Sequence, residues 1–152
     1  MEYSEKEMNI ICDACCSTFI LVASSDNDIH TKEEEYFLQN YQSVLQNLKI
    51  VSDPKEIAVL EFWANERFTH EHISDLIVQP KPVHIENILT SVQLVETKEH
   101  AHVLHHYKKS LLDLGSNIAK SAHAFWGLGP QVSENEHQIL NELSRCLDIP
   151  LS

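Results

Sequence analysis

The residues best suited to bind a cation lie in one acidic stretch, ASSDNDIHTKEEEYFL, at positions 23–38. Asp26 and Asp28 come first, and a run of glutamates that includes Glu33 and Glu34 then opens a predicted helix. Carboxylate oxygens are the ligands that calcium and magnesium prefer in proteins. The stretch is therefore either a pocket of oxygen ligands or a solvated turn whose glutamates cap a helix. It is not an EF-hand, because the central glycine and the acidic twelfth residue are missing.

A segment near the other end of the chain, at 124–140, repeats this pattern weakly. Each copy has a helix, a loop, a β-branched residue and, four positions later, a glutamate that opens the next helix. Those glutamates, Glu33 and Glu136, stand in line with the apolar rows of their helices, so both are predicted to face inward. Carboxylates that converge on one point repel one another unless they are protonated, solvated or bridged by a cation. The candidate ligands for calcium or magnesium are Asp26, Asp28, Glu33, Glu34 and Glu136.

The acidic residue, short turn, apolar residue and glutamate at a junction of two helices resemble the tellurite-resistance TerB-like family. The glycine-containing turn and the VS..E helix start of the second copy are similar to that family's C-terminal half. The resemblance covers residues 1–48 and 118–152. It implies an all-helical fold whose two half-motifs approach each other and bind a divalent cation. It also implies a stress-response role without enzymatic activity. At Asn27–Asp28 and at 129–131 the chain departs from the family pattern, so only one metal site is expected.

Histidines offer an alternative metal site and, with it, a metalloenzyme. His102 and His106 are one helical turn apart, a spacing that chelates zinc or iron. The phase of their helix places both opposite the apolar row through Tyr107, and therefore on a solvated face. His70 and His72 are only two positions apart, so on a helix they diverge, and we expect them on the surface.

Three cysteines, Cys12, Cys15 and Cys16, lie in the middle of a predicted helix. A reactive Cys-x-x-Cys pair draws its low pKa from a helix N-terminus, where backbone N–H groups are unpaired. In mid-helix those groups are already bonded, so we interpret the cysteines as small buried apolar residues. The sequence shows no nucleophile motif and no phosphate-binding loop, and we expect no enzymatic activity.

The net charge of the chain limits the classes of partner that we expect it to bind. The 152 residues include 23 acidic and 11 basic side chains, and the formal net charge is −12. Such a surface repels phosphate backbones and anionic lipid, so we expect neither nucleic-acid binding nor membrane insertion. The acidic start has no secretory-signal pattern, and four cysteines are not a disulfide framework in a chain of this size. We therefore expect a cytoplasmic protein with a protein partner, and the oligomeric state stays open.

The helices that position these residues follow from apolar periodicity. Three glycines and five prolines leave little turn chemistry for strands, and about seven helices result in one domain over 1–152. Ser4 opens the first helix with a capping box, Thr69 begins a short helix, and 79–82 is a linker. The longest helix carries Gly115, which either kinks it or lets a neighbour approach closely. The remaining predicted starts are near Thr31, at Asp53, Val83, after Thr97 and at Ser133.

These patterns predict a single all-α domain that acts as a non-enzymatic cation-binding or interaction module in a stress response. The histidine metalloenzyme and a metal-free protein–protein interaction domain are the two alternatives.

Overall fold

Every regular element that the structure describes is a helix. The computed structural model describes residues 3–26, 31–40, 58, 62, 65–125 and 134–150. The helices are α1 (Glu5–Ala23), the 3-10 helix η1 (Ser24–Asp26), α2 (Thr31–Asn40), α5 (His70–Ile77), α6 (Lys81–Lys98), α7 (Ala101–Phe125) and α8 (Glu134–Leu147). The predicted all-α class is confirmed for these ranges, while most of the helix predicted from Asp53 lies outside them. Among the described helices, none has the length and apolar character that a membrane span requires.

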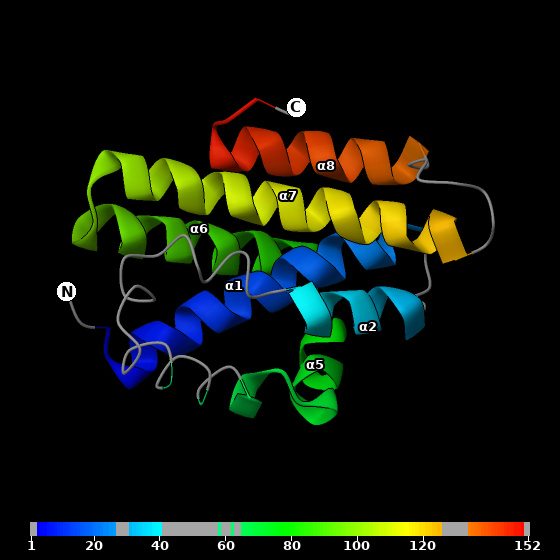
Figure 1. Ribbon diagram of the computed structural model, residues 1–152, viewed down its shortest axis with the longest axis horizontal. Coiled ribbons are helices and arrows are strands. Elements are labelled where there is room, and N and C mark those ends of the chain that lie inside the picture. Colours follow the sequence, from blue (N-terminus) through cyan, green and yellow to red (C-terminus); the bar gives the residue numbers. More distant parts are fainter. Residues whose placement is uncertain are drawn as a thin grey trace.

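The first helix, α1, forms the centre of the bundle. It packs against α5, α6, α7 and α8, and Figure 1 shows it between α6 and α5. From Ala14 to Ala23 every residue of α1 is buried. A helix that is buried around its whole circumference needs internal partners for its polar side chains. Thr18 donates to the carbonyl oxygen of Ala14, and Ser17 reaches across to α6.

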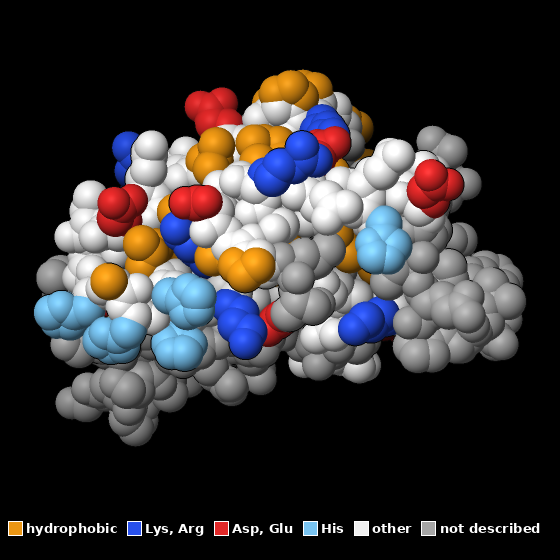
Figure 2. Space-filling model, turned by 90° about the horizontal axis from the view of Figure 1, so that it is seen from above, with side chains coloured by type: hydrophobic (Ala, Val, Ile, Leu, Met, Phe, Trp, Pro, Cys, Tyr) orange, Lys and Arg blue, Asp and Glu red, His pale blue; other side chains and the backbone are white. Residues whose placement is uncertain are grey.

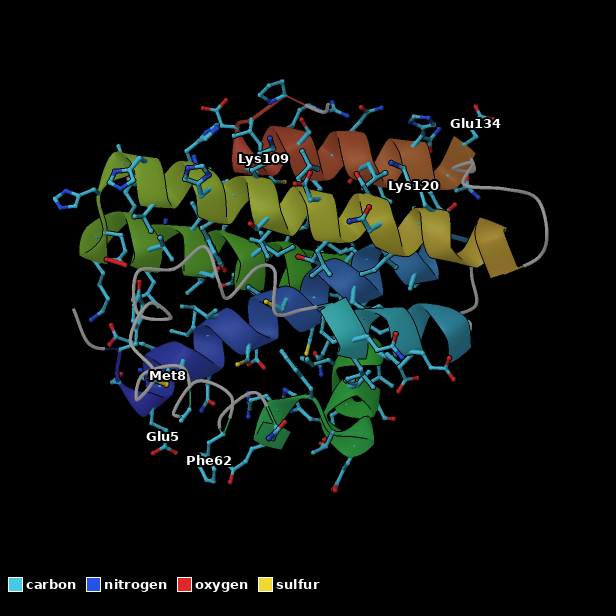
Figure 3. All side chains as sticks on the ribbon, in the orientation of Figure 1. Glu5, Met8, Phe62, Lys109, Lys120 and Glu134 are labelled. Carbon is cyan, nitrogen blue, oxygen red and sulfur yellow. The ribbon has the colours of Figure 1, made fainter. Side chains whose placement is uncertain are left out.

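The helix starts obey local capping rules. Ser4 accepts a hydrogen bond from the backbone N–H of Glu7, and the Glu7 carboxylate accepts one from the N–H of Ser4, so the predicted capping box is confirmed. Glu5, in the same turn, points away from the bundle (Figure 3). Thr69 caps α5 by accepting from the N–H of His72, which confirms the predicted start.

The helix α6 begins earlier than predicted. It starts at Lys81, inside the segment 79–82 that was expected to be a linker. Pro82 occupies the first turn, where a missing N–H costs nothing because that group has no partner within a helix. The linker prediction is therefore wrong at its second half, where two residues, Lys81 and Pro82, belong to α6.

The helices α6, α7 and α8 lie in sequence across the bundle (Figure 1). The predicted apolar row of α7 is buried: Tyr107, Leu111, Leu114 and Ile118. Gly115 lies on the side of α7 that faces α1 and α8. A Cβ atom there would lie 3.2 Å from Cγ2 of Val22 and 3.3 Å from Cδ2 of both Leu140 and Leu143. Of the two roles expected for Gly115, the close approach of neighbours is the one confirmed.

An aromatic contact joins α2 to the core. Phe37 is fully buried, and its ring stacks on that of Phe19 with centroids 4.9 Å apart and an interplanar angle of 11°. The ring of Phe68 meets Phe37 edge-on at 5.2 Å. These contacts fix the helix that follows the acidic stretch against α1.

Candidate functional site

Four of the five predicted metal ligands lie on three described elements, η1, α2 and α8. Asp26 ends η1 and Glu33 lies in the first turn of α2, but both side chains are outside the described residues, as is all of Asp28. Glu34 is half-buried on α2, and Glu136 is buried near the start of α8. The helix η1 packs against α8, so the ends of the two acidic segments meet. Whether these carboxylates share a cation stays a prediction.

The inward orientation of Glu136 is confirmed. Its exposed fraction is 2%, and it shares a buried face of α8 with Leu140, Leu143 and Leu147. The N-terminal turn of a helix carries partial positive charge and favours a carboxylate there. Within the described ranges, no group of three or more His, Cys, Asp and Glu side chains is arranged to hold a metal ion.

The histidines at the start of α7 lie on the surface, as predicted for His102 and His106. With His100 and His105 they form a histidine patch, and Figure 2 shows histidine side chains gathered at one end of the molecule. The rings of His100 and His102 stack with centroids 5.9 Å apart. Lys109 projects from the same helix, with Lys120 farther along it (Figure 3). Metal binding by the patch stays a prediction.

The prediction that His72 lies on the surface is wrong. Its Nε2 is 2.8 Å from Oδ1 of Asp13, and its side chain is only 20% exposed. Arg67 donates to the same carboxylate, with Nη2 2.6 Å from Oδ2 and Nε 3.2 Å from Oδ1. This half-buried cluster ties α5 and the segment before it to α1. The side chain of His70 lies outside the described residues.

A cavity of about 330 Å³ opens where η1, α6 and α8 meet. The end of α1 and the end of α5 complete its wall. Four of its lining residues are aliphatic: Ile20, Leu21, Ile77 and Ile139. The others are polar, and they include Lys81 and His84 from α6 and Glu142 from α8. The volume lies at the lower end of the range of small-molecule sites, and the predominantly polar lining suits a polar ligand.

One lining residue of this cavity, His84, belongs to a hydrogen-bonded chain of three residues that continues into the core. Asn87 donates from Nδ2 to Oγ of Ser17 at 3.0 Å, and Oγ of Ser17 lies 3.0 Å from Nδ1 of His84. A hydroxyl oxygen can accept two hydrogen bonds, so the direction of the contact with Nδ1 depends on the tautomer of His84. We assign Oγ of Ser17 as the donor, and with this assignment the imidazole proton of His84 is on Nε2.

His84 is buried, with 2% of its surface exposed, and its Nε2 has no partner at full hydrogen-bonding geometry, although backbone groups of Gln79 and Leu76 lie near the ring. Burial lowers the pKa of His84 below its ordinary value of 6.5, and the nearby backbone of Gln79 and Leu76 offsets part of that effect. The ring is therefore neutral at pH 7, and in the assigned tautomer Nε2 is a donor on a residue that lines the cavity. A buried donor left without an acceptor costs about 1–3 kcal/mol, which a suitable ligand would recover.

The burial of His84 follows from a pattern in the sequence that was not among the predictions. His84, Ile88, Val92 and Val95 follow one another at steps of four, four and three on α6, and all four are buried. A histidine on such a row is buried and needs a partner. The partner Ser17 carries no comparable signal, because it is 67 positions from His84 and 70 from Asn87, which donates to it.

The arrangement favours binding over catalysis. Ser17 and His84 are paired like a nucleophile and its base, but Ser17 is fully buried and is not among the described residues that line the cavity. Cys12, Cys15 and Cys16 are fully buried, which confirms their interpretation as apolar residues. Burial raises the pKa of Cys12 to about 12 and lifts those of Cys15 and Cys16 well above the usual range. These thiols are protonated at pH 7 and are poor nucleophiles.

Comparison of the chain with protein-family models, with curated proteins and with solved structures finds no match.

Proposed function

We propose that the protein is a non-enzymatic binding module that takes a small polar ligand in the cavity between η1, α6 and α8. One observation carries this proposal: His84 lines the cavity, is buried, and has a ring nitrogen without a partner. Buried polar groups in folded proteins are paired with protein or water, and an exception calls for an explanation. A ligand that accepts a hydrogen bond from Nε2 is such an explanation.

The cavity also lies beside the two acidic segments that carry the metal ligands predicted from the sequence. Ser24 and Ser25 belong to η1, the element that ends in Asp26, and both line the cavity. Gln138 and Glu142 of α8 line the opposite wall, one and two turns after the start that carries Glu136. A ligand bound here bridges the two acidic segments of the chain.

A cation at the acidic junction is a second candidate function, favoured by the burial of Glu136 and by the packing of η1 on α8. We propose calcium or magnesium, held by Asp26, Asp28 and Glu33 and joined by Glu34 or Glu136. The ion would neutralise the junction and stabilise it for docking of a protein partner. A TerB-like role in stress resistance belongs to this form of the proposal.

The cavity is tested by screening a fragment library against the full chain by methyl NMR. We expect hits that shift the signals of Ile20 and Ile139, which line the cavity, and that leave Leu38, an exposed residue of α2, unchanged. His84→Gln keeps a donor near Nε2, whereas His84→Leu removes it, so binding should persist in the first variant and fall in the second. The thermal midpoint of each variant shows that it is folded. Absence of any hit at Ile20 and Ile139 in the wild type overturns the proposal.

The cation is tested separately by thermal melting with calcium, magnesium, zinc and iron. A ligand that binds only the native state raises the melting temperature. We expect stabilisation by calcium or magnesium that disappears in Glu33→Gln and remains in Glu35→Gln, since Glu35 is exposed on α2. Stabilisation by zinc or iron that disappears in His102→Ala would instead point to the histidine patch.

A further inference from the structure

The cavity carries one positive and one negative group that already face each other. Nζ of Lys81 lies 2.5 Å from Oε2 of Glu142, and their side chains are 51% and 41% exposed. Both residues line the cavity, one from α6 and one from α8. The charges of the pair cancel, so the pair alone favours neither an anion nor a cation. A molecule that carries both charges can match both groups.

The charged and hydroxyl groups of the wall also differ between its two sides. On α6, Lys81 and His84 are three positions apart and share one face of the first turn, and both offer protons. The N-terminal end of that helix adds partial positive charge on the same side. On η1, Ser24 and Ser25 donate their hydroxyl protons to the carbonyl oxygens of Ile20 and Val22, so their oxygens remain as acceptors.

The acceptor side continues on α8, where Glu142 supplies a carboxylate. Among the charged and hydroxyl groups, the donors therefore lie on α6 and the acceptors on η1 and α8, while the amides of Gln79, Asn135 and Gln138 can do either. The aliphatic side chains of Ile20, Leu21, Ile77 and Ile139 also line the cavity; they make no hydrogen bonds and favour an apolar group.

Resting on the proposed binding function, we propose that the ligand is a small zwitterion of the aliphatic amino-acid class. Its carboxylate accepts from Nε2 of His84 and pairs with Lys81. Its ammonium group donates to Glu142 and to the hydroxyl oxygens of Ser24 and Ser25. Its side chain packs against the aliphatic residues of the cavity. Ligand binding thus replaces the direct Lys81–Glu142 pair with two charge-assisted contacts.

The test is calorimetric titration of the full chain with three matched probes. L-leucine carries both charges, 4-methylpentanoate lacks the ammonium group, and 3-methylbutylamine lacks the carboxylate. We expect leucine to bind at least about tenfold more tightly than either analogue, because each lost contact is a hydrogen bond to a charged group. The Nε2–H of His84 should appear as a protonated nitrogen in imidazole ¹⁵N spectra, and its signal should move on leucine binding.

Substitutions in the cavity, each with a matched control elsewhere on the surface, test whether leucine binds in the cavity. Lys81→Met and Glu142→Gln should each weaken leucine binding about tenfold or more. Lys109→Met and Glu96→Gln change the same residue types at exposed positions away from the cavity and should leave binding unchanged. Both cavity substitutions lie at partly exposed positions, and unchanged thermal midpoints would show that the fold is intact.

Several outcomes overturn the zwitterion. Equal affinity for 4-methylpentanoate and leucine, or tight binding of inorganic phosphate, would make this an anion site. Equal affinity for 3-methylbutylamine would make it a cation site. If the cavity binds library fragments but none of the three probes, the zwitterion proposal is wrong and the proposed binding function is retained. A cavity that binds no fragment at all overturns both.

Discussion

Nδ1 of His84 lies 3.0 Å from Oγ of Ser17, and this contact joins the most buried helix of the bundle to the wall of its cavity. Ser17 belongs to the half of α1 that is buried on all sides, so its hydroxyl group has no access to water. With Ser17 assigned as the donor, His84 supplies the acceptor for its hydroxyl proton, and the imidazole proton of His84 is on Nε2. One hydrogen bond therefore serves both the stability of the core and the chemistry of the cavity.

Replacement of Ser17 by alanine tests the structural half of this relationship. Ser17→Ala leaves Nδ1 of His84 and Nδ2 of Asn87 without a partner, so we expect the free energy of unfolding to fall by about 2 kcal/mol. Ser74→Ala, at an exposed position of α5, should change it by less than about 0.5 kcal/mol. Urea unfolding of both variants measures the difference. Equal losses in the two variants would show that the buried hydrogen bond contributes nothing.

Acid should destabilise the protein through His84. Burial lowers the pKa of His84 in the folded state, so below its ordinary value of 6.5 the unfolded chain binds more protons than the native one. The stability contributed by neutral His84 is complete above pH 6.5 and declines as the pH falls below it, by at most about 1.4 kcal/mol per pH unit.

Unfolding of the wild type and of His84→Gln between pH 8 and pH 5 measures this decline. The variant should lack it, so the two stability curves should converge as the pH falls. The range stops at pH 5 because Glu7 begins to contribute below 4.5: hydrogen bonding to the backbone of Ser4 lowers its pKa, so its stabilisation is lost on further acidification. Parallel curves above pH 5 would contradict the role given to His84.

The part of the fold that follows from short-range rules was predictable. The capping box of Ser4 and Glu7, the cap at Thr69 and the buried row through Tyr107 each depend on residues within a few positions of one another. The inward position of Glu136 also follows from helical phase alone. The start of α6 was missed because a proline in a first turn looks like a linker in the sequence.

The cavity could not be predicted in the same way. Its polar chain joins residues separated by 67 and 70 positions, and no local pattern pairs Ser17 with His84 or Asn87. The same holds for Asp13 and His72, which are 59 positions apart in the sequence. Their contact partly buries His72, so the prediction that His72 lies on the surface is wrong. The position of such polar residues in the helical repeat predicts that they are buried, but only the packing of the helices shows which of them are in contact.

The cysteines should differ sharply in reactivity. Cys12, Cys15 and Cys16 are fully buried with raised pKa values, whereas Cys146 is half-buried on α8. We expect Ellman's reagent at pH 8 to modify one thiol in the native protein and all four after denaturation, because a buried protonated thiol does not attack the reagent. Cys146→Ser should remove the native reaction. Rapid modification of two or more native thiols would show that α1 is accessible.

The packing of α7 against α1 and α8 should be most sensitive at Gly115. A Cβ atom there would already press on Cγ2 of Val22 at 3.2 Å and on Cδ2 of Leu140 and Leu143 at 3.3 Å, so the two further methyl groups of valine have no room. Overpacking of a core typically costs about 1–3 kcal/mol, and we expect Gly115→Val to lower the free energy of unfolding by about 3 kcal/mol. The gain in helix propensity from replacing glycine is smaller than this cost.

Asn117→Val is the matched control, because it adds a β-branched residue to the same helix at an exposed position. Its effect should stay within about 0.5 kcal/mol. Urea unfolding measures both variants, and circular dichroism shows whether each keeps its helix content. If Gly115→Val were as stable as Asn117→Val, α7 would have to stand farther from α1 and α8 than the structure places it. The η1–α8 junction, and with it the cavity, would then need a different geometry.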